Sequence, residues 1–293
     1  MRAFETYHPI VLFTYFLAVI GLSIFFMHPI YLLITLIISI TLNIILNKRS
    51  FKNSLLFYIP LFIIVSLCNP FFSHDGMKVL FYVNYNPITL EAILYGVAMA
   101  TMLLSVVFWF GSYNSVMTSD KFLYLFGKMS PAISLILSLT LRLVPRFKKQ
   151  IKIIAHSQKT IGMDYTSGTI LHRIKSCLQI LSILITWALE NSIETADSMK
   201  ARGYGLKNRS AFSLFIFTKR DRIVLTMIIS LAVINLIGSA FGYSTYYFYP
   251  TFSEIALTNI SILLYSSYAL LLAIPIIIET RESIKWHSLK SKI

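Results

Sequence analysis

The sequence reads Asp197-Ser198-Met199-Lys200-Ala201-Arg202-Gly203-Tyr204-Gly205 at the end of a long helical pattern that begins near Ile170. Glycine tolerates the left-handed backbone conformation that ends many helices, so this stretch predicts a helix C-cap at Gly203 or Gly205. Arg202 would then lie at the negative pole of the helix dipole, where a cation is favoured. Its planar guanidinium can bind a carboxylate or carbonyls on another protein; the alternative is an ordinary basic helix terminus.

The chain has the composition of an integral membrane protein. Of its 293 residues, 56% are hydrophobic and only 13% are charged. Most of its apolar runs are long enough to cross about 30 Å of hydrocarbon as helices, at about 1.5 Å per residue. The third run is shorter and crosses only together with its flanking residues. The runs are Ile10–Met27, Ile30–Leu46, Leu55–Cys68, Ile88–Phe110, Ile223–Phe241 and Ile255–Ile278. We predict about six transmembrane helices and no cleavable signal, because the first run leads through His28-Pro29 straight into the second.

The net charge of +14 is distributed in a way that indicates membrane topology rather than nucleic-acid binding. Seventeen Lys and Arg residues lie between Phe110 and Ile223, and further cations lie between the second and third runs and in the C-terminal tail. If both termini are cytoplasmic, only Lys78 of the 26 cationic residues lies outside. The positive-inside rule therefore predicts this orientation, and the basic excess also suits attraction to lipid headgroups.

Several residues that could suggest a metal or proton site have structural interpretations. The pairs His8-Pro9 and His28-Pro29 mark opposite ends of one predicted helix, about 30 Å apart, so they cannot share an ion; we interpret them as helix starts. Cys68 and Cys177 are isolated and predict neither a disulfide nor a metal site. Glu91 lies near the outer end of the fourth run, where the positive end of the helix dipole tolerates a carboxylate.

The connection 71–87 between the third and fourth runs is predicted to be external. It contains Asp75-Gly76 and Asn86-Pro87, which are both turn signals.

The segment Gly111–Arg222 is unusually long for a connection between two spans, and its periodicity predicts two long helices. After Pro145, apolar residues recur at helical spacing while basic residues occupy another face, which predicts an amphipathic helix at the membrane surface. The second helix begins near Ile170, and its apolar core is too short to span. We expect both helices to lie along or dip into the cytoplasmic interface; if one of them crossed, the topology after it would invert.

An acidic stripe on the second helix, formed by Glu190, Glu194 and Asp197, leaves two alternatives open. It could pair with Arg146, Lys149 and Lys152 of the first helix, or it could be a solvated face.

Sequence motifs of common active sites are missing from the chain. There is no Gly-x-x-x-x-Gly-Lys-[Ser/Thr] loop to hold a nucleotide phosphate, and no His-Glu-x-x-His, Cys-x-x-Cys or Gly-x-Ser-x-Gly. His156 and His172 are isolated and more typical of interface residues than of bases. The spans also lack the paired carboxylates and broken helices of ion-coupled carriers. We predict no catalytic residue, no metal and no cofactor.

Taken together, these features resemble the transmembrane T component of energy-coupling factor (ECF) transporters, the EcfT or CbiQ-like family. The resemblance covers nearly the whole chain, and its most specific part is the signature Ser198–Gly205. It implies two long coupling helices, each ending in an Ala-Arg-Gly-like motif whose arginine docks in a groove of an ATP-binding cassette ATPase. Carried over to this chain, the second ATPase-coupling motif is Ala201, Arg202 and Gly203.

The first motif departs from the family pattern. The equivalent stretch is Ser157-Gln158-Lys159-Thr160-Ile161-Gly162, and the arginine position holds Ile161. Isoleucine offers no hydrogen-bond donor from its side chain, so an arginine-type anchor cannot form there. Three alternatives remain open: the contact is apolar, Lys159 substitutes, or the two ATPase contacts are unequal. Lys159, Thr160, Ile161 and Gly162 are the weaker coupling candidates.

The resulting prediction is an all-α integral membrane protein, multi-pass in the cell membrane of a prokaryote, with both termini cytoplasmic. The expected regions are an N-terminal membrane region 1–110, a cytoplasmic coupling region 111–222, a transmembrane hairpin 223–278 and a basic tail 279–293. The resemblance implies a non-enzymatic coupling subunit of an ATP-driven importer for a vitamin or a transition-metal ion. Its implied partners are one or two ATP-binding cassette ATPases and a substrate-binding membrane S component. The alternatives are a self-sufficient membrane transporter or channel, and a lipid-active membrane enzyme.

Overall fold

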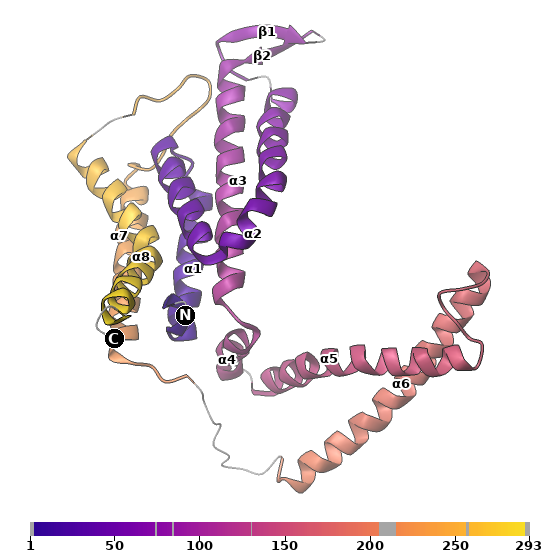
Figure 1. Cartoon of the computed structure of the whole chain (residues 1–293). Coiled ribbons are helices and arrows are strands. Elements are labelled where there is room, and N and C mark those ends of the chain that lie inside the picture. Colours follow the sequence, from indigo (N-terminus) through magenta and orange to yellow (C-terminus); the bar gives the residue numbers. More distant parts are fainter. Residues whose placement is uncertain are drawn as a thin grey trace. The chain divides into compact units, whose positions relative to one another are not determined.

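The computed structural model describes residues 3–73, 75–83, 85–129, 131–204, 215–255 and 258–290. Contacts between residues divide the chain into two compact units. The first unit combines Met1–Phe122 with Phe215–Ile293, and the second is Leu123–Leu214. Helices dominate both units (Figure 1). The first unit contains η1 (Phe4–Thr6), α1 (Pro9–Phe25), α2 (Pro29–Phe72), β1 (Val79–Val83), β2 (Asn86–Thr89), α3 (Leu90–Val116), α7 (Lys219–Ala240) and α8 (Asn259–Lys290). The second contains α5 (Pro131–Thr160) and α6 (Ile170–Ala201), and the unpredicted α4 (Ser119–Met129) crosses the boundary.

Helices α1 and α2 begin at the two His-Pro pairs. In each helix proline occupies the first turn, where its missing N–H leaves no hydrogen bond unmade. The preceding histidine is the N-cap: Nδ1 of His8 accepts from the Ile10 N–H at 3.3 Å, and Nδ1 of His28 accepts from the Ile30 N–H at 3.3 Å. The interpretation of both pairs as helix starts is confirmed.

The second and third predicted spans belong to one helix, α2, which is bent. Asn43 Nδ2 donates to the Phe108 carbonyl at 3.2 Å, and the rings of Tyr58 and Phe108 lie 4.6 Å apart between centroids. A straight helix would separate residues 43 and 58 by about 22 Å, at about 1.5 Å per residue. The helix must therefore change direction between them, as Figure 1 shows, and its second half runs beside α3.

The contact between α2 and α3 depends on a small residue. A Cβ built on Gly96 of α3 would lie 2.4 Å from the Ser66 carbonyl oxygen of α2, so the two backbones approach too closely for any side chain. One turn away, Asn69 Nδ2 donates to the Ala92 carbonyl at 2.7 Å. A close backbone approach and a side-chain hydrogen bond thus hold this helix pair together.

The connection between α2 and α3 contains an antiparallel hairpin of β1 and β2 that the sequence did not predict. Asn86-Pro87 forms the start of β2, and the turn that it signals lies directly before it, at Tyr85, which has φ 66° and the left-handed conformation. Strand β1 forms because Val79–Val83 is a run of branched and aromatic residues that favour extended structure. Gly76, with φ 132°, lies in the other predicted turn.

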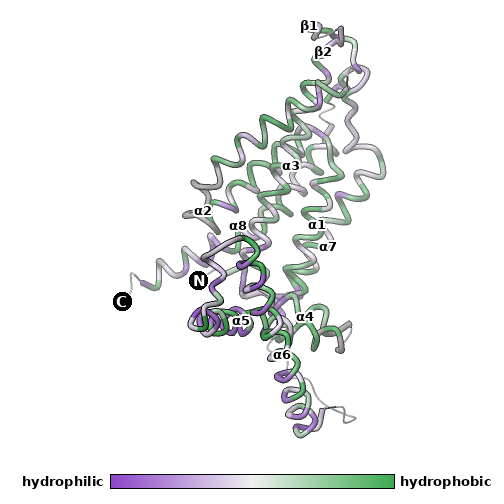
Figure 2. Tube along the Cα trace, turned by 90° about the vertical axis from the view of Figure 1, so that its right-hand side faces the viewer, coloured by the Kyte–Doolittle hydropathy of each residue, from purple (hydrophilic) through white to green (hydrophobic). Residues whose placement is uncertain are grey.

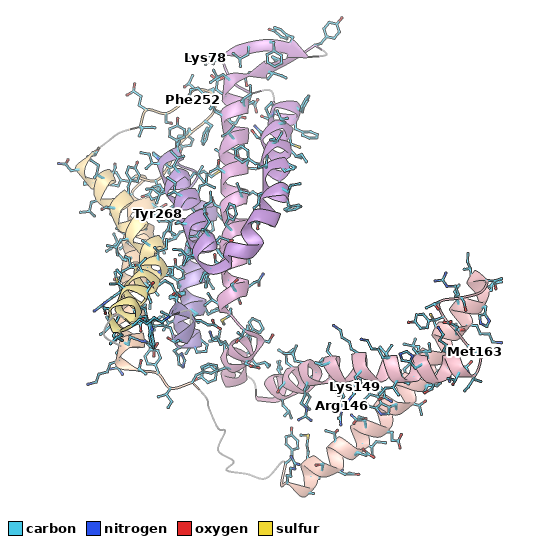
Figure 3. The ribbon with its side chains drawn as sticks, viewed as in Figure 1. Lys78, Arg146, Lys149, Met163, Phe252 and Tyr268 are labelled. Carbon is cyan, nitrogen blue, oxygen red and sulfur yellow. The ribbon has the colours of Figure 1, made fainter. Side chains whose placement is uncertain are left out.

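Glu91 attaches the hairpin to the start of α3. The side chain is 1% exposed, and its two carboxylate oxygens each lie 3.3 Å from the backbone nitrogen of Lys78, which donates to them. Figure 3 labels Lys78 beside the hairpin. These contacts support the structural interpretation of Glu91.

Buried tyrosines join α1, α2 and α8. Tyr15 donates to the Leu272 carbonyl at 2.9 Å, and the Tyr268 hydroxyl lies 2.8 Å from Thr35 Oγ1 and 3.3 Å from Ser23 Oγ. Both tyrosines are 0% exposed, and Figure 3 labels Tyr268 within the bundle. Burial of a phenol requires a hydrogen-bond partner, so these contacts fix how the three helices pack.

The first and last parts of the chain meet at the N-terminal end of α1. The His8 N–H donates to Asp221 Oδ1 of α7 at 3.0 Å, and the Phe4 N–H donates to Glu279 Oε1 of α8 at 3.0 Å. These charged acceptors explain why residues far apart in the sequence form one unit.

The surfaces of these helices are suited to lipid. Five described helices or helix segments are long and apolar enough to cross a membrane: Pro29–Leu46, Leu90–Val116, Ile170–Ala201, Lys219–Ala240 and Asn259–Lys290. Pro9–Phe25 and Leu56–Phe72 are shorter apolar helices. Figure 2 shows the hydrophobic colouring along α1, α2 and α3. The chain is an all-α membrane protein; length and hydropathy also admit α6 as a span, so its predicted interfacial position stays a prediction.

The second unit is built from two long helices. Helix α6 begins at Ile170 as predicted, whereas α5 begins at Pro131, well upstream of its predicted start, and contains Pro145 in its interior. The rings of Phe147 and Trp187 pack edge to face with centroids 5.8 Å apart, and Arg146 donates to Asn191 Oδ1 at 3.0 Å. The helices therefore pack along their middles.

Candidate functional site

The end of α6 has the geometry of a Schellman cap. The Tyr204 N–H donates to the Met199 carbonyl at 3.0 Å, and the Gly203 N–H donates to the Lys200 carbonyl at 2.9 Å. Gly203 has φ 77°, the left-handed conformation that this motif requires. The helix ends at this glycine as predicted, but the C-cap is Arg202 and Gly203 is the residue after it. Gly205, the other predicted cap, lies outside the described residues.

Arg202 is the residue that this cap presents. It occupies the C-cap position between the last helical residue, Ala201, and Gly203, with φ −82° and ψ 7°. Its side chain is exposed, and no described residue forms a hydrogen bond or ion pair with its guanidinium. The neighbouring Lys200 instead approaches Asp197 at 3.9 Å, an exposed pair of little energetic weight. Arg202 is thus a cation at the negative end of a helix, with its donors available.

The end of α5 has the same cap. The Met163 N–H donates to the Gln158 carbonyl at 3.0 Å, the Gly162 N–H donates to the Lys159 carbonyl at 3.1 Å, and Gly162 has φ 86°. Ile161 therefore occupies in α5 the position that Arg202 occupies in α6. The two motifs, Thr160-Ile161-Gly162 and Ala201-Arg202-Gly203, match in backbone hydrogen bonding although their cap side chains differ in chemistry.

The loop after the α5 cap is fixed by polar contacts. Lys159 Nζ lies 3.2 Å from Asp164 Oδ2, while Thr166 donates to Asp164 Oδ1 from its N–H at 2.9 Å and from its hydroxyl at 2.7 Å. The Thr166 hydrogen bonds, with a smaller contribution from Lys159, hold the pKa of Asp164 well below its usual value. Asp164 is therefore an anion at neutral pH that binds both residues.

This loop also packs against α6. Ser176 Oγ, on a fully buried residue of α6, lies 3.9 Å from Met163 Sδ, and Arg173 Nε donates to the Tyr165 carbonyl at 3.0 Å. Figure 3 labels Met163 at this end of the helix pair. We did not predict this arrangement from the sequence, although the spacing Asp164-x-Thr166 is a known signal for a locally bonded turn.

The acidic stripe of α6 resembles a solvated face. Glu190, Glu194 and Asp197 are all exposed, and within the described part of the chain none of them forms an ion pair with the basic residues of α5. The hydrogen bond from Arg146 goes to the neutral Asn191 instead. Figure 3 labels Arg146 and Lys149 along the middle of α5.

The second unit contains two histidines, His156 and His172. His156 is exposed and His172 is half-buried. The described residues contain no group of three or more His, Cys, Asp or Glu residues placed to hold a metal ion. Cys177 borders two open hollows that are lined mainly by aliphatic side chains. One, of about 330 Å³, lies between α5 and α6, and the other, of about 560 Å³, lies on α6 and the loop before it.

The chain is similar to a known protein family over more than half of its length. A model of the CbiQ family, described as cobalt transport protein, matches residues 6–214, more than half of the chain. The energy-coupling factor transporter transmembrane protein EcfT of Staphylococcus aureus is 36% identical over 103 residues, covering 35% of this chain and 38% of the relative. The protein of that name from Listeria innocua is 36% identical over 104 residues, which again cover 35% of this chain and 38% of the relative. The protein of that name from Bacillus subtilis is 31% identical over 103 residues, which cover 35% of this chain and 39% of the relative.

The apolar helices and their exposed hydrophobic side chains define a multi-pass membrane protein. The chain belongs to the CbiQ family. Its alignments with the EcfT relatives span less than half of the length of those proteins.

Proposed function

We propose that the chain is the T component of an ECF-type transporter, the membrane subunit that couples ATPases to a separate substrate-binding membrane protein. The observation that carries this proposal is the pair of matched helix caps, one of which presents Arg202 with its donors available. A guanidinium on a rigid helix end is suited to bind a groove lined by carboxylates or carbonyls. Membership of the CbiQ family and the similarity to EcfT proteins support the same function.

The proposed partners are one or two ATP-binding cassette ATPases and a small substrate-binding membrane S component. Ala201, Arg202 and Gly203 would form the main ATPase contact, and residues 159–162 a second one. Because α5 and α6 are packed together along their middles, movement of an ATPase at either helix end would be transmitted along the helix pair. The cargo would be a vitamin or a transition-metal ion bound by the S component.

The charge distribution supports a proposal for the orientation in the membrane. We propose that both termini and the Gly111–Arg222 segment lie in the cytoplasm, since this leaves one cation outside out of 26. The ATPase-binding ends of α5 and α6 would then face the compartment that contains ATP.

A purified chain without partners is expected to show no ATP hydrolysis and no nucleotide binding above background, because the sequence has no phosphate-binding loop. The measurement is ATP turnover and radiolabelled ATP retention by the chain in lipid nanodiscs, before and after adding the ATPases from the same host. Hydrolysis should appear only with the ATPases. Stoichiometric ATP binding by the chain alone would contradict the proposed function, and transport by chain-only liposomes would favour a self-sufficient transporter.

A further inference from the structure

The ends of α5 and α6 have one backbone geometry and two different side-chain chemistries. Both end in a Schellman cap with glycine in the left-handed conformation, at φ 86° for Gly162 and φ 77° for Gly203. The cap residue is an aliphatic side chain, Ile161, in α5 and a cation, Arg202, in α6. Ile161 is 73% exposed, so its side chain is available to a partner.

Lys159 does not replace the missing arginine. Lys159 lies three residues before Gly162, just as Lys200 lies three residues before Gly203 in α6. Both helices therefore carry a lysine at this position, and only α6 carries an arginine at the cap. The Lys159 ammonium also lies 3.2 Å from the Asp164 carboxylate, which neutralises it locally. The tip of α5 therefore presents an aliphatic group beside a satisfied ion pair.

The turn that carries Ile161 is held in place. Asp164 accepts two hydrogen bonds from Thr166, and Met163 contacts the buried Ser176 of α6. A preformed turn can bind a partner without losing much conformational freedom on binding. Ile161 is thus displayed on a turn that is held by contacts on both sides.

The two side chains cannot be bound well by the same kind of groove. A groove with carboxylate or carbonyl acceptors for a guanidinium would leave those acceptors unpaired around isoleucine, which is costly. A groove lined by apolar side chains would have to desolvate the guanidinium without pairing it, which is also costly. A difference in affinity between two partners arises from such mismatches as much as from favourable contacts.

We propose that Ile161 binds an apolar pocket on an ATPase subunit, and that this pocket differs in chemistry from the acceptor-lined groove that binds Arg202. The inference rests on the proposed function. If the proposal holds, the ATPase assembly has two binding sites of different chemistry, one for each helix end. The chain therefore binds to the assembly in one orientation only.

Site-specific photocrosslinking tests this inference in the whole complex. Tyr165 and Tyr204 follow the two caps, are 43% and 50% exposed, and can each be replaced by p-benzoylphenylalanine. After irradiation in native membranes, the crosslinked peptides are identified by mass spectrometry. We expect both positions to crosslink to ATPase polypeptides, with apolar residues lining the site reached from position 165 and acidic or carbonyl-rich residues lining that reached from position 204.

A variant series makes the test quantitative. Ile161→Arg, introduced with the crosslinker at position 165, is expected to lower the crosslinked ATPase at least tenfold, because it places an unpaired cation in the apolar pocket. Ile161→Leu should retain the yield. His156→Arg is the matched control: it adds the same charge to an exposed position about one and a half turns earlier, on the other side of the helix, and should leave the yield unchanged.

The outcomes separate the inference from the proposed function. No ATPase crosslink from either position would contradict the proposed function itself. Three results would overturn the inference alone: crosslinks from both positions to the same groove, a crosslink from position 165 to a polypeptide other than an ATPase, or an unchanged or raised yield with Ile161→Arg.

Discussion

Arg202→Glu is expected to abolish retention of the ATPases by the chain, and transport with it, while membrane insertion and folding are preserved. Truncating one partner of a buried charged hydrogen bond typically costs about 2–5 kcal/mol, which is about a 30-fold or greater loss of affinity. Reversing the charge adds repulsion from the acceptors that bind the guanidinium. The folded chain should tolerate the change because Arg202 is exposed and no described residue bonds to its guanidinium.

The measurement is the amount of ATPase that copurifies with the tagged chain from host membranes, relative to the amount of chain. Lys200→Glu is the matched control, since it reverses a charge two residues away at a side chain that is 78% exposed. It should retain most of the ATPase. Arg202→Lys should be intermediate because lysine keeps the charge but lacks the planar fork of donors. Ile161→Ala should cost less than either Arg202 variant. Wild-type retention by Arg202→Glu would mean that the motif is only a helix terminus.

Gly203→Val is expected to weaken the coupling contact, though less than charge reversal at Arg202 does. Gly203 has φ 77°, and a β-branched residue in this left-handed conformation costs of order 1–3 kcal/mol. The last turn of α6 would relieve this strain by giving up the hydrogen bonds from Gly203 to Lys200 and from Tyr204 to Met199. Arg202 would then lose its fixed position, although its charge would remain.

Gly203→Asn is the control for this prediction, because asparagine adopts the left-handed conformation more readily than other non-glycine residues. We expect about a tenfold loss of retained ATPase for the valine variant and near-wild-type retention for the asparagine variant. Equal retention by both variants would show that the cap geometry does not matter for binding.

The sequence predicted the parts of the fold that depend on local patterns. The apolar runs, the His-Pro helix starts and the glycine cap at residue 203 each follow from preferences of a few neighbouring residues. The bend of α2 and the close approach at Gly96 depend on contacts between helices, which periodicity does not reveal. The hairpin was missed because Asn86-Pro87 is a strong turn signal that here lies in a strand.

The candidate site was predicted in the same uneven way. The signature predicts Arg202 and the register predicts Ile161 as its counterpart, and both roles stay predictions. The sequence did not reveal the partner of Lys159, which is Asp164 at 3.2 Å, a carboxylate that also accepts from Thr166. The partners that fix the end of α5 lie in the loop after that helix, outside the motif itself.

The most direct test of the account is to purify the tagged chain from its native membranes in mild detergent and to identify and count every polypeptide that accompanies it. We expect ATP-binding cassette ATPases and a small membrane protein in fixed ratio to the chain, with the ATPases lost selectively in Arg202→Glu. A chain that purifies alone and still transports substrate would contradict it.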